Sequence, residues 1–172
     1  MKPSEWVVTH ARYLKPGGTV LDLACGSGRH SRYLLSRRYN VTSVDINVTG
    51  VADLSMHPNC QVVQADLEQH PVKWPFNHFD GIVVTNYLHR PLFDYIISSL
   101  ATEGVLIYQT FMRGNEEYGK PSNARFLLRE DELMDAFQGP LEVLSFSQGY
   151  VDDPKPAMVQ GICCRRLRVV SQ

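Results

Sequence analysis

The chain has 172 residues, of which 44% are hydrophobic, and its formal net charge at neutral pH is -1. This length is typical of one domain with a full hydrophobic core. No stretch approaches the roughly 18 to 20 apolar residues of a membrane span, and a charge near zero gives no general attraction for polyanions. We therefore expect a single cytoplasmic domain over residues 1–172, without a membrane or a nucleic acid as its partner. The oligomeric state stays open.

The cysteines do not suggest a metal site. None of the four has the paired CxxC spacing of a zinc ligand set. Neighbouring cysteines in a strand point to opposite faces of the sheet, so the pair near the end of the chain is not expected to act together. We expect reduced thiols and no bound metal. The four residues are Cys25, Cys60, Cys163 and Cys164.

Strands and helices are expected to alternate through the first half of the chain. Ser4 is a candidate N-cap for a short helix that ends before Pro16. Nearly continuous apolar runs are typical of parallel strands that are buried on both faces. Such strands are expected at 19–25, 40–46, 61–65 and 79–85, with a helix at 29–38 and a weak helix at 48–54.

In the second half, apolar residues at helical spacing predict a helix over 92–100, and a strand follows at 105–109. Residues 112–126 are too polar and too rich in glycine and proline for a regular element. Because this segment leaves a strand at its carboxyl end, we expect an inserted, lid-like loop there. The lid residues expected to contact a substrate are Arg113, Glu116 and Tyr118.

The last part of the chain predicts a helix around Leu133 and Phe137 and then strands at 141–146 and 158–165. The connection at 152–156 is too short for a crossover helix, so the last strand should run antiparallel. The predicted fold class is α/β. We expect a doubly wound, mostly parallel seven-stranded sheet with an antiparallel last strand and helices on both faces.

A glycine turn between the first strand and its helix is the most informative motif. Residues 21–30 read LDLACGSGRH, and Gly26 and Gly28 would let the backbone approach a ligand closely. Ser31 stands where a dinucleotide-binding motif has its third glycine. Asp22, inside the strand, would repel a pyrophosphate but attract an ammonium group. The turn therefore favours a cofactor with a positive charge over a dinucleotide.

Acidic residues also close the next two strands. Asp45 is placed to accept hydrogen bonds from both hydroxyls of a ribose, as acids do at this position in nucleotide-binding sheets. Asp66 could accept a hydrogen bond from an adenine amino group. A turn or capping role is the alternative for Asp66, because aspartate favours such positions.

Three segments, LDLACGSGRHS, VTSVDIN and QVVQADLE, resemble the class I S-adenosylmethionine (AdoMet) methyltransferases, particularly the small bacterial type grouped with tellurite-resistance methyltransferases. The resemblance implies a Rossmann-like fold with AdoMet as the cofactor. It implies that the glycine turn binds the methionine end of AdoMet. The cofactor-binding residues expected on this basis are Asp22, Ala24, Gly26, Gly28, His30, Asp45, Ile46, Asp66, Leu67 and Asn86.

The segment 86–89, NYLH, resembles the motif after the fourth strand from which such enzymes face the transferred methyl. His89 could accept a proton near neutral pH, Arg90 could orient an anionic acceptor and Tyr87 could shape the pocket. These three residues are the candidate catalytic set. The alternative is that His89 and Arg90 merely begin the helix at Pro91. His30 likewise has two interpretations, as a contact to the cofactor carboxylate or as a local structural hydrogen bond.

The expected function is transfer of a methyl group from AdoMet to an acceptor, most simply a small molecule, with release of S-adenosylhomocysteine. A noncatalytic AdoMet-binding module and a methyltransferase acting on RNA or protein are the alternatives. A nicotinamide oxidoreductase is disfavoured by the missing third glycine. AdoMet, but not NAD, should then raise the melting temperature.

Overall fold

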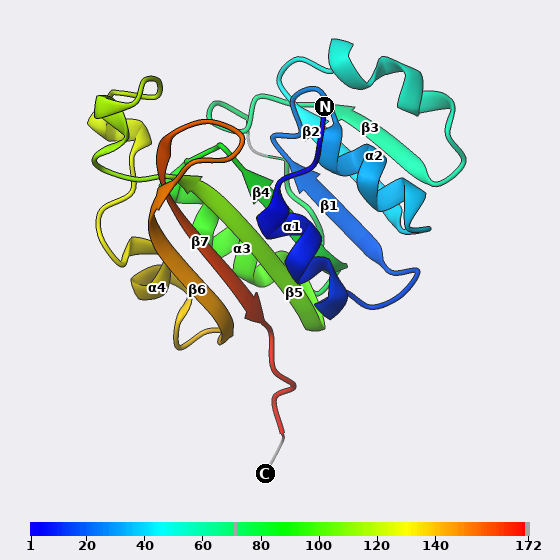
Figure 1. Ribbon diagram of the computed structural model, residues 1–172. Helices are drawn as coiled ribbons and strands as arrows, with labels where there is room; N and C mark the ends of the chain where they lie inside the picture. The colour runs from blue at the N-terminus through cyan, green and yellow to red at the C-terminus, as the bar shows by residue number, and fades with distance from the viewer. Residues whose placement is uncertain (71, 171–172) are drawn as a thin grey trace.

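The computed structural model describes residues 1–70 and 72–170, which build one mixed sheet flanked by helices (Figure 1). Its strands are β1 (Thr19–Leu23), β2 (Asn40–Asp45), β3 (Cys60–Gln64), β4 (Phe79–Thr85), β5 (Leu100–Phe111), β6 (Glu142–Val151) and β7 (Ala157–Arg165). The seven strands lie in the order β3-β2-β1-β4-β5-β7-β6. β1 to β5 pair in parallel, and β7 runs antiparallel to both of its neighbours, β5 and β6. The predicted fold class is confirmed.

Four short α-helices pack around the sheet, namely α1 (Glu5–His10), α2 (Arg29–Ser36), α3 (Phe93–Ser99) and α4 (Glu132–Phe137). The weak helix expected at 48–54 is a 3-10 helix over Thr49–Met56. The helix expected at 92–100 is split, because Arg90–Leu92 forms a separate 3-10 turn and Leu100 already belongs to β5. Among the helices that the structure describes, none has the length and apolar character to cross a membrane.

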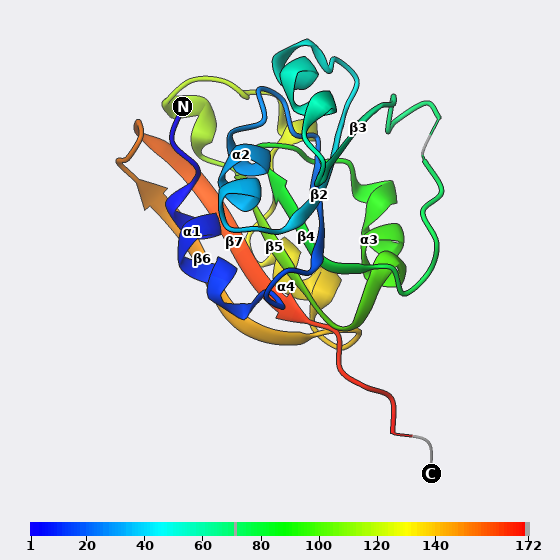
Figure 2. The same cartoon turned by 90° about the vertical axis from the view of Figure 1, so that its right-hand side faces the viewer.

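Alternating side chains of the central strands fill two separate cores. In β4, Ile82 and Val84 belong to the core beneath α3 and α4, whereas Val83 belongs to the core beneath α1 and α2. Figure 2 shows these helix pairs on opposite sides of the sheet. The same alternation separates Cys163 from Cys164, whose thiols are both free and completely buried. The prediction that these neighbours face opposite ways is correct.

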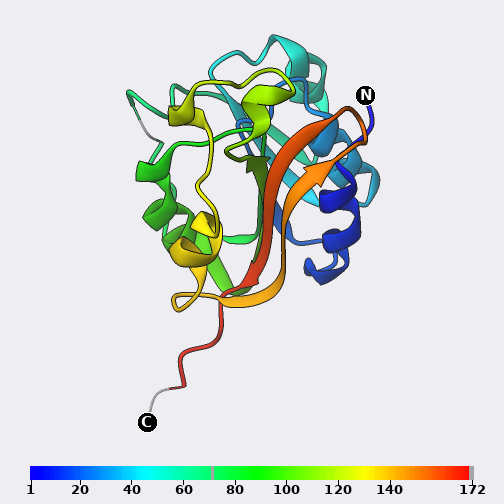
Figure 3. The ribbon, with the colours of Figure 1, turned by 60° about the vertical axis from the view of Figure 1, so that its left-hand side comes forward.

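The connection between the last two strands is a hairpin, as its length predicts. Val151 pairs with Ala157, which leaves residues 152–156 as the loop. The hairpin places β7 between β5 and β6 (Figure 3). The inserted segment after β5 therefore leaves the sheet beside β7, at the edge where β1, β2 and β4 also end.

The N-cap prediction for Ser4 needs correction. Ser4 occupies the N-cap position of α1, but its side chain caps nothing. Its hydroxyl instead donates to Gln109 Oε1 at 2.9 Å, and its backbone N–H donates to His30 Nε2 at 3.0 Å. Local sequence could not show this, because both partners come from distant elements. The start of the chain is thus fixed to the end of β5 and to α2.

Candidate functional site

The glycine turn at the end of β1 has an unusual backbone. Ala24, Gly26 and Gly28 all have left-handed conformations, with φ of 54°, 54° and 76°. This conformation is ordinary for glycine but costs energy for alanine. A strained alanine beside two left-handed glycines fits a turn whose backbone shape is needed for binding.

The two glycines of the turn have different surroundings. A Cβ on Gly28 would lie 2.3 Å from Val51 Cγ1, so the 3-10 helix at Thr49–Met56 packs directly on the turn. A Cβ on Gly26 would have no atom within 4 Å. The turn therefore packs against the 3-10 helix at Gly28 and is open to a ligand at Gly26.

Asp45 fixes this turn to the end of β2. Its Oδ2 accepts the Gly26 N–H at 2.8 Å, and its Oδ1 accepts the Asn47 N–H at 3.0 Å. Each carboxylate oxygen has a second lone pair, so it can still accept a hydrogen bond from a ribose hydroxyl. The neighbouring Ile46 is 60% exposed at the same edge of the sheet. These residues place a charged acceptor and an apolar surface side by side.

Asp22 is buried, whereas a direct contact with a ligand's ammonium group would need an exposed carboxylate. It is 1% exposed and accepts a hydrogen bond from Ser31 Oγ at 2.6 Å, and Ser31 also bonds Ser43 at 2.7 Å between their Oγ atoms. Burial raises the pKa of Asp22 to about 6, against the opposing hydrogen bond from Ser31. Its influence on a ligand is therefore through charge and through the position of the turn.

His30 is engaged on both ring nitrogens within the protein. Nε2 accepts the Ser4 N–H, and Nδ1 lies 3.2 Å from Thr85 Oγ1. Burial, with a smaller effect from the nearby Arg29 charge, lowers the pKa of His30 to about 4. The neutral ring then carries its proton on Nδ1 and donates to Thr85. These contacts favour the structural interpretation over a contact with the cofactor carboxylate.

Asp22 and His30 should make opposite contributions to the pH dependence of stability. The folded-state pKa of Asp22 is raised from 3.8 to about 6, so its contribution is full below pH 3.8 and is lost as the pH rises through 6. The folded-state pKa of His30 is depressed from 6.5 to about 4, so its contribution is full above pH 6.5 and is lost as the pH falls through 4. Between pH 4 and 6 the two effects cancel.

Asp22→Asn should expose the His30 effect. The variant's free energy of unfolding should rise with pH more steeply than the parent's between pH 4 and 6, by up to about 1.4 kcal/mol per pH unit. Urea unfolding at closely spaced pH values measures this slope. His30→Asn should change the slope in the opposite direction. Parallel pH profiles for the parent and both variants would contradict the assignment.

Asp66 and Leu67 follow β3. Asp66 Oδ1 accepts the N–H groups of Glu68 and Gln69 at 3.0 and 3.1 Å, so the carboxylate does stabilise a turn. Leu67 is 5% exposed and packs in the core beneath α3. Of the two interpretations of Asp66, the turn is therefore present, and binding of adenine stays a prediction.

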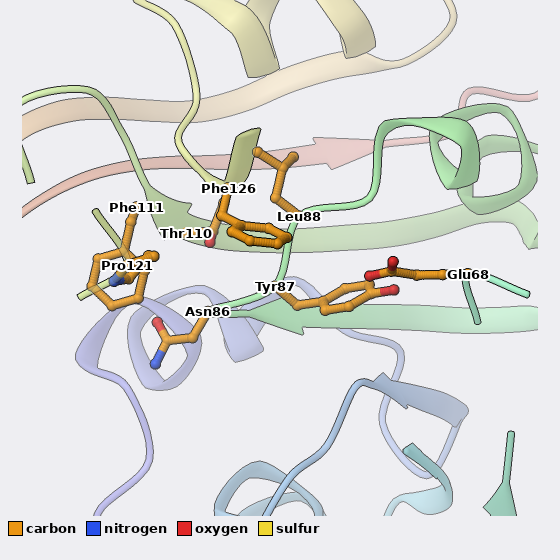
Figure 4. Close-up of a pocket in the computed structure, with 8 residues that line it drawn as sticks. All are labelled: Glu68, Asn86, Tyr87, Leu88, Thr110, Phe111, Pro121 and Phe126. Carbon is orange, nitrogen blue, oxygen red and sulfur yellow. The ribbon is translucent and has the colours of Figure 1, made fainter. Parts of the chain in front are cut away.

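A cavity of about 260 Å³ opens beside the end of β4 (Figure 4). It is lined by Glu68, Asn86, Tyr87, Leu88, Thr110, Phe111, Pro121 and Phe126. Asn86 has a φ of 54°, which is unusual for a residue other than glycine and directs the chain around the cavity. Burial, followed by the charges of Glu68, Asp66 and Asp45, raises the pKa of Tyr87 to about 12. Tyr87 therefore stays protonated at neutral pH.

His89 and Arg90 line a second cavity, of about 200 Å³, rather than the first. The two cavities are adjacent, because both are lined by Glu68, Leu88 and Phe126. The structure thus places Tyr87 and His89 in adjacent cavities.

Arg90 is held by the protein itself. Its guanidinium pairs twice with the buried carboxylate of Glu132, once through Nε and once through Nη2 at 3.1 Å. It also donates to the carbonyls of Arg125 and Leu127 at 3.0 and 3.1 Å. The predicted role in orienting an anionic acceptor would require these bonds to break. The geometry supports a positioning role, in which Arg90 fixes the end of the 112–126 segment.

The lid-like segment covers the first cavity with apolar residues. Pro121 and Phe126 reach the cavity, whereas none of the three polar residues expected to contact the acceptor lines it. Glu116 accepts the Gly114 N–H at 2.9 Å, and Tyr118 packs against Tyr150 with ring centroids 5.3 Å apart. Arg113, Glu116 and Tyr118 do not line the first cavity, and their contact with an acceptor stays a prediction.

Residues 20–103 match a methyltransferase domain family. The match spans the glycine turn, Asp45, Asp66 and the motif after β4. No curated protein sequence is significantly similar to the chain.

Solved structures show the same fold. TehB from Haemophilus influenzae superposes with a TM-score of 0.79 at 22% identity, over 95% of this chain and 62% of that protein. The present chain thus spans less than two thirds of TehB. An S-adenosylmethionine-dependent methyltransferase from Methanosarcina mazei gives a TM-score of 0.74 at 16% identity, covering 97% and 99% of the two chains.

A third structure was solved with ligands. It is the Burkholderia thailandensis 1,6-didemethyltoxoflavin-N1-methyltransferase with bound 1,6-didemethyltoxoflavin and S-adenosylhomocysteine. It superposes with a TM-score of 0.70 at 18% identity, over 95% of this chain and 76% of that one. The chain therefore has the fold of the S-adenosylmethionine-dependent methyltransferases.

Proposed function

We propose that this protein transfers a methyl group from AdoMet to a small-molecule acceptor and releases S-adenosylhomocysteine. The observation that carries the proposal is the left-handed turn at Gly26, open to a ligand and bonded to Asp45, at the same sheet edge as the cavity beside Tyr87. The family match over residues 20–103 supports it. A cytoplasmic location and a single-domain organisation stay predictions.

The charge of this edge fits AdoMet better than a dinucleotide. AdoMet carries a positive ammonium and a positive sulfonium, whereas NAD carries a negative pyrophosphate. Three adjacent strands carry acids at this edge, because Asp22 lies near the end of β1, Asp45 ends β2 and Asp66 follows β3. Glu68 comes shortly after Asp66. We place the methionine end of AdoMet at the glycine turn, the ribose at Asp45 and the adenine beside Ile46.

When AdoMet is bound, its sulfonium supplies the reactive methyl group. The contribution of the protein is alignment of the acceptor, which can lower a barrier by as much as about 7 to 11 kcal/mol. Tyr87 and Phe126 enclose the acceptor and exclude water. His89 is the candidate to accept a proton if the acceptor arrives protonated. Arg90 acts indirectly, through the segment that it holds.

The cavities favour a small acceptor over RNA or protein. Their volumes, about 260 and 200 Å³, suit a compact molecule. Turnover on a panel of small acceptors, read by S-adenosylhomocysteine release, tests this directly. Tight AdoMet binding without turnover on any acceptor would instead support the noncatalytic alternative.

Asp45→Ala should weaken AdoMet binding at least tenfold while the protein stays folded. A hydrogen bond to a charged group is worth about 1.5 to 3 kcal/mol, and the ribose offers two. Calorimetric titration measures the effect. Asp53→Ala is the matched control, because Asp53 is exposed and pairs with Arg32 on the surface. Binding within threefold of the parent would remove Asp45 from the cofactor site.

Asp45→Asn separates the two roles of this carboxylate. Asparagine can still accept the Gly26 N–H and thereby keep the turn in place, but it loses the charge and one of the acceptor oxygens. We expect an affinity between those of the parent and of Asp45→Ala. Equal losses for both substitutions would show that keeping the hydrogen bond to Gly26 preserves none of the affinity.

A further inference from the structure

A threonine side chain from the end of β5 lines the cavity beside β4. Thr110 is 1% exposed, lines the cavity and comes from the end of β5 (Figure 4). Its neighbour Gln109 accepts a hydrogen bond from Ser4, but no such bond engages the Thr110 hydroxyl within the described part of the chain. The Thr110 hydroxyl is therefore available to a ligand in the cavity.

Aromatic rings form part of the walls of the same cavity. In Figure 4, the ring of Phe126 lies on one side and that of Tyr87 on the other, with the Pro121 ring beyond them. Phe126 is 41% exposed, although it belongs to a segment anchored at both ends. Aromatic faces stabilise a planar ligand by stacking. A puckered aliphatic molecule would make fewer contacts with both rings.

Polar groups lie at the two ends of this space. Glu68 lies at one end, and Asn86 and Thr110 lie toward the other (Figure 4). A ligand between the rings would therefore meet hydrogen-bonding groups along its edge. Because Glu68 is negatively charged and lines both cavities, an anionic acceptor is disfavoured.

We propose that the methyl acceptor is a planar ring compound, uncharged or cationic, that is held between Tyr87 and Phe126 and hydrogen-bonded at its edge by Thr110. This inference rests on the proposed methyltransferase function and names its substrate class. It also disfavours small oxyanions as acceptors at this site.

Matched probes test planarity and charge separately. The flat neutral probes are phenol and 2-naphthol, their puckered counterparts are cyclohexanol and decahydro-2-naphthol, and the flat anions are benzoate and 2-naphthoate. Each is titrated into the full chain saturated with S-adenosylhomocysteine, and binding is measured by ligand-observed NMR. At least one flat alcohol should bind tenfold or more tightly than both its puckered and its anionic counterpart.

Substitutions then test the two contacts. Thr110→Val should weaken binding of the flat alcohol at least fivefold, whereas Thr110→Ser, which keeps the hydroxyl, should stay within twofold of the parent. Phe126→Ala should weaken it about tenfold. Phe76→Ala is the matched control, because Phe76 is 78% exposed and lies in a different loop. It should leave binding unchanged.

Two readouts distinguish failure of this inference from failure of the proposed function. S-adenosylhomocysteine binding is measured first and should stay within twofold of the parent in all four variants. If it binds but neither flat alcohol is preferred, or if Thr110→Val behaves like Thr110→Ser, the planar-acceptor inference is overturned and the cofactor assignment stands. If S-adenosylhomocysteine does not bind the parent protein, the proposed function itself is wrong.

Discussion

Gly28→Ala is expected to lower the free energy of unfolding by about 3 kcal/mol. A left-handed conformation costs an alanine about 1 kcal/mol, and the new methyl would clash with Val51 Cγ1, 2.3 Å away. Overpacking of this kind typically costs about 1 to 3 kcal/mol. Urea unfolding followed by circular dichroism measures the loss. Val51→Ala in the same chain should recover part of it, because the second substitution removes the clashing methyl group.

Gly26→Ala provides the contrast within the same turn. No atom lies within 4 Å of the new Cβ, so we expect a loss of stability of only about 1 kcal/mol from backbone strain. Its methyl would stand where the ligand approaches the turn, so AdoMet affinity should fall more than tenfold. Equal losses of stability for the two alanine variants, or unchanged AdoMet binding in Gly26→Ala, would show that we have assigned the two faces of the turn incorrectly.

Arg90→Ala is expected to destabilise the protein by about 2 to 3 kcal/mol. The substitution leaves the buried carboxylate of Glu132 without its main partner, and breaking a buried pair typically costs about 3 to 5 kcal/mol. We use a value below that range because the Arg90 side chain is 39% exposed and Arg129 also bonds Glu132. Denaturant unfolding near neutral pH measures the effect. Arg113→Ala, in an exposed part of the same segment, is the control.

The pH dependence of the stability lost in Arg90→Ala tests the ion pair between Arg90 and Glu132. Burial opposes ionisation of Glu132, but hydrogen bonds from Arg90 and Arg129 outweigh it, so the pKa of Glu132 is lowered. Its contribution to stability is therefore present above its unfolded pKa of 4.5 and is lost as the pH falls below that value. The difference between Arg90→Ala and the parent should shrink under acid conditions. A hundredfold loss of kcat with unchanged stability would instead support the predicted catalytic role.

Much of the fold could be predicted because its signals are local. The apolar runs of β1 and β4 and the short loop at 152–156 specify buried parallel strands and a final hairpin. The glycine turn was recognisable for the same reason, since Gly26 and Gly28 lie within a few residues of the strand that they follow. Element ends were less accurate, as the early start of β5 at Leu100 shows.

Residues brought together over long distances could not be predicted. Arg90 reads locally as a helix start or a substrate contact, and only the fold shows that its partner is Glu132 in α4. His30 likewise meets Ser4 and Thr85 through packing. In the lid-like segment, polarity suggested charged contacts, but the residues of 112–126 that line the first cavity are Pro121 and Phe126. Thr110 gave no signal, because a threonine near the end of a strand is ordinary.

Because side chains alternate along β7, each of the two cores contains one buried cysteine of this strand. Cys163 and Cys164 are adjacent in the chain, yet each thiol is enclosed by a different core. Burial raises the pKa of both to about 12, so almost no reactive thiolate exists until the surrounding layer opens. The rate at which a thiol reagent labels each cysteine therefore measures how often that layer opens, so the two faces of the sheet can be followed separately during unfolding.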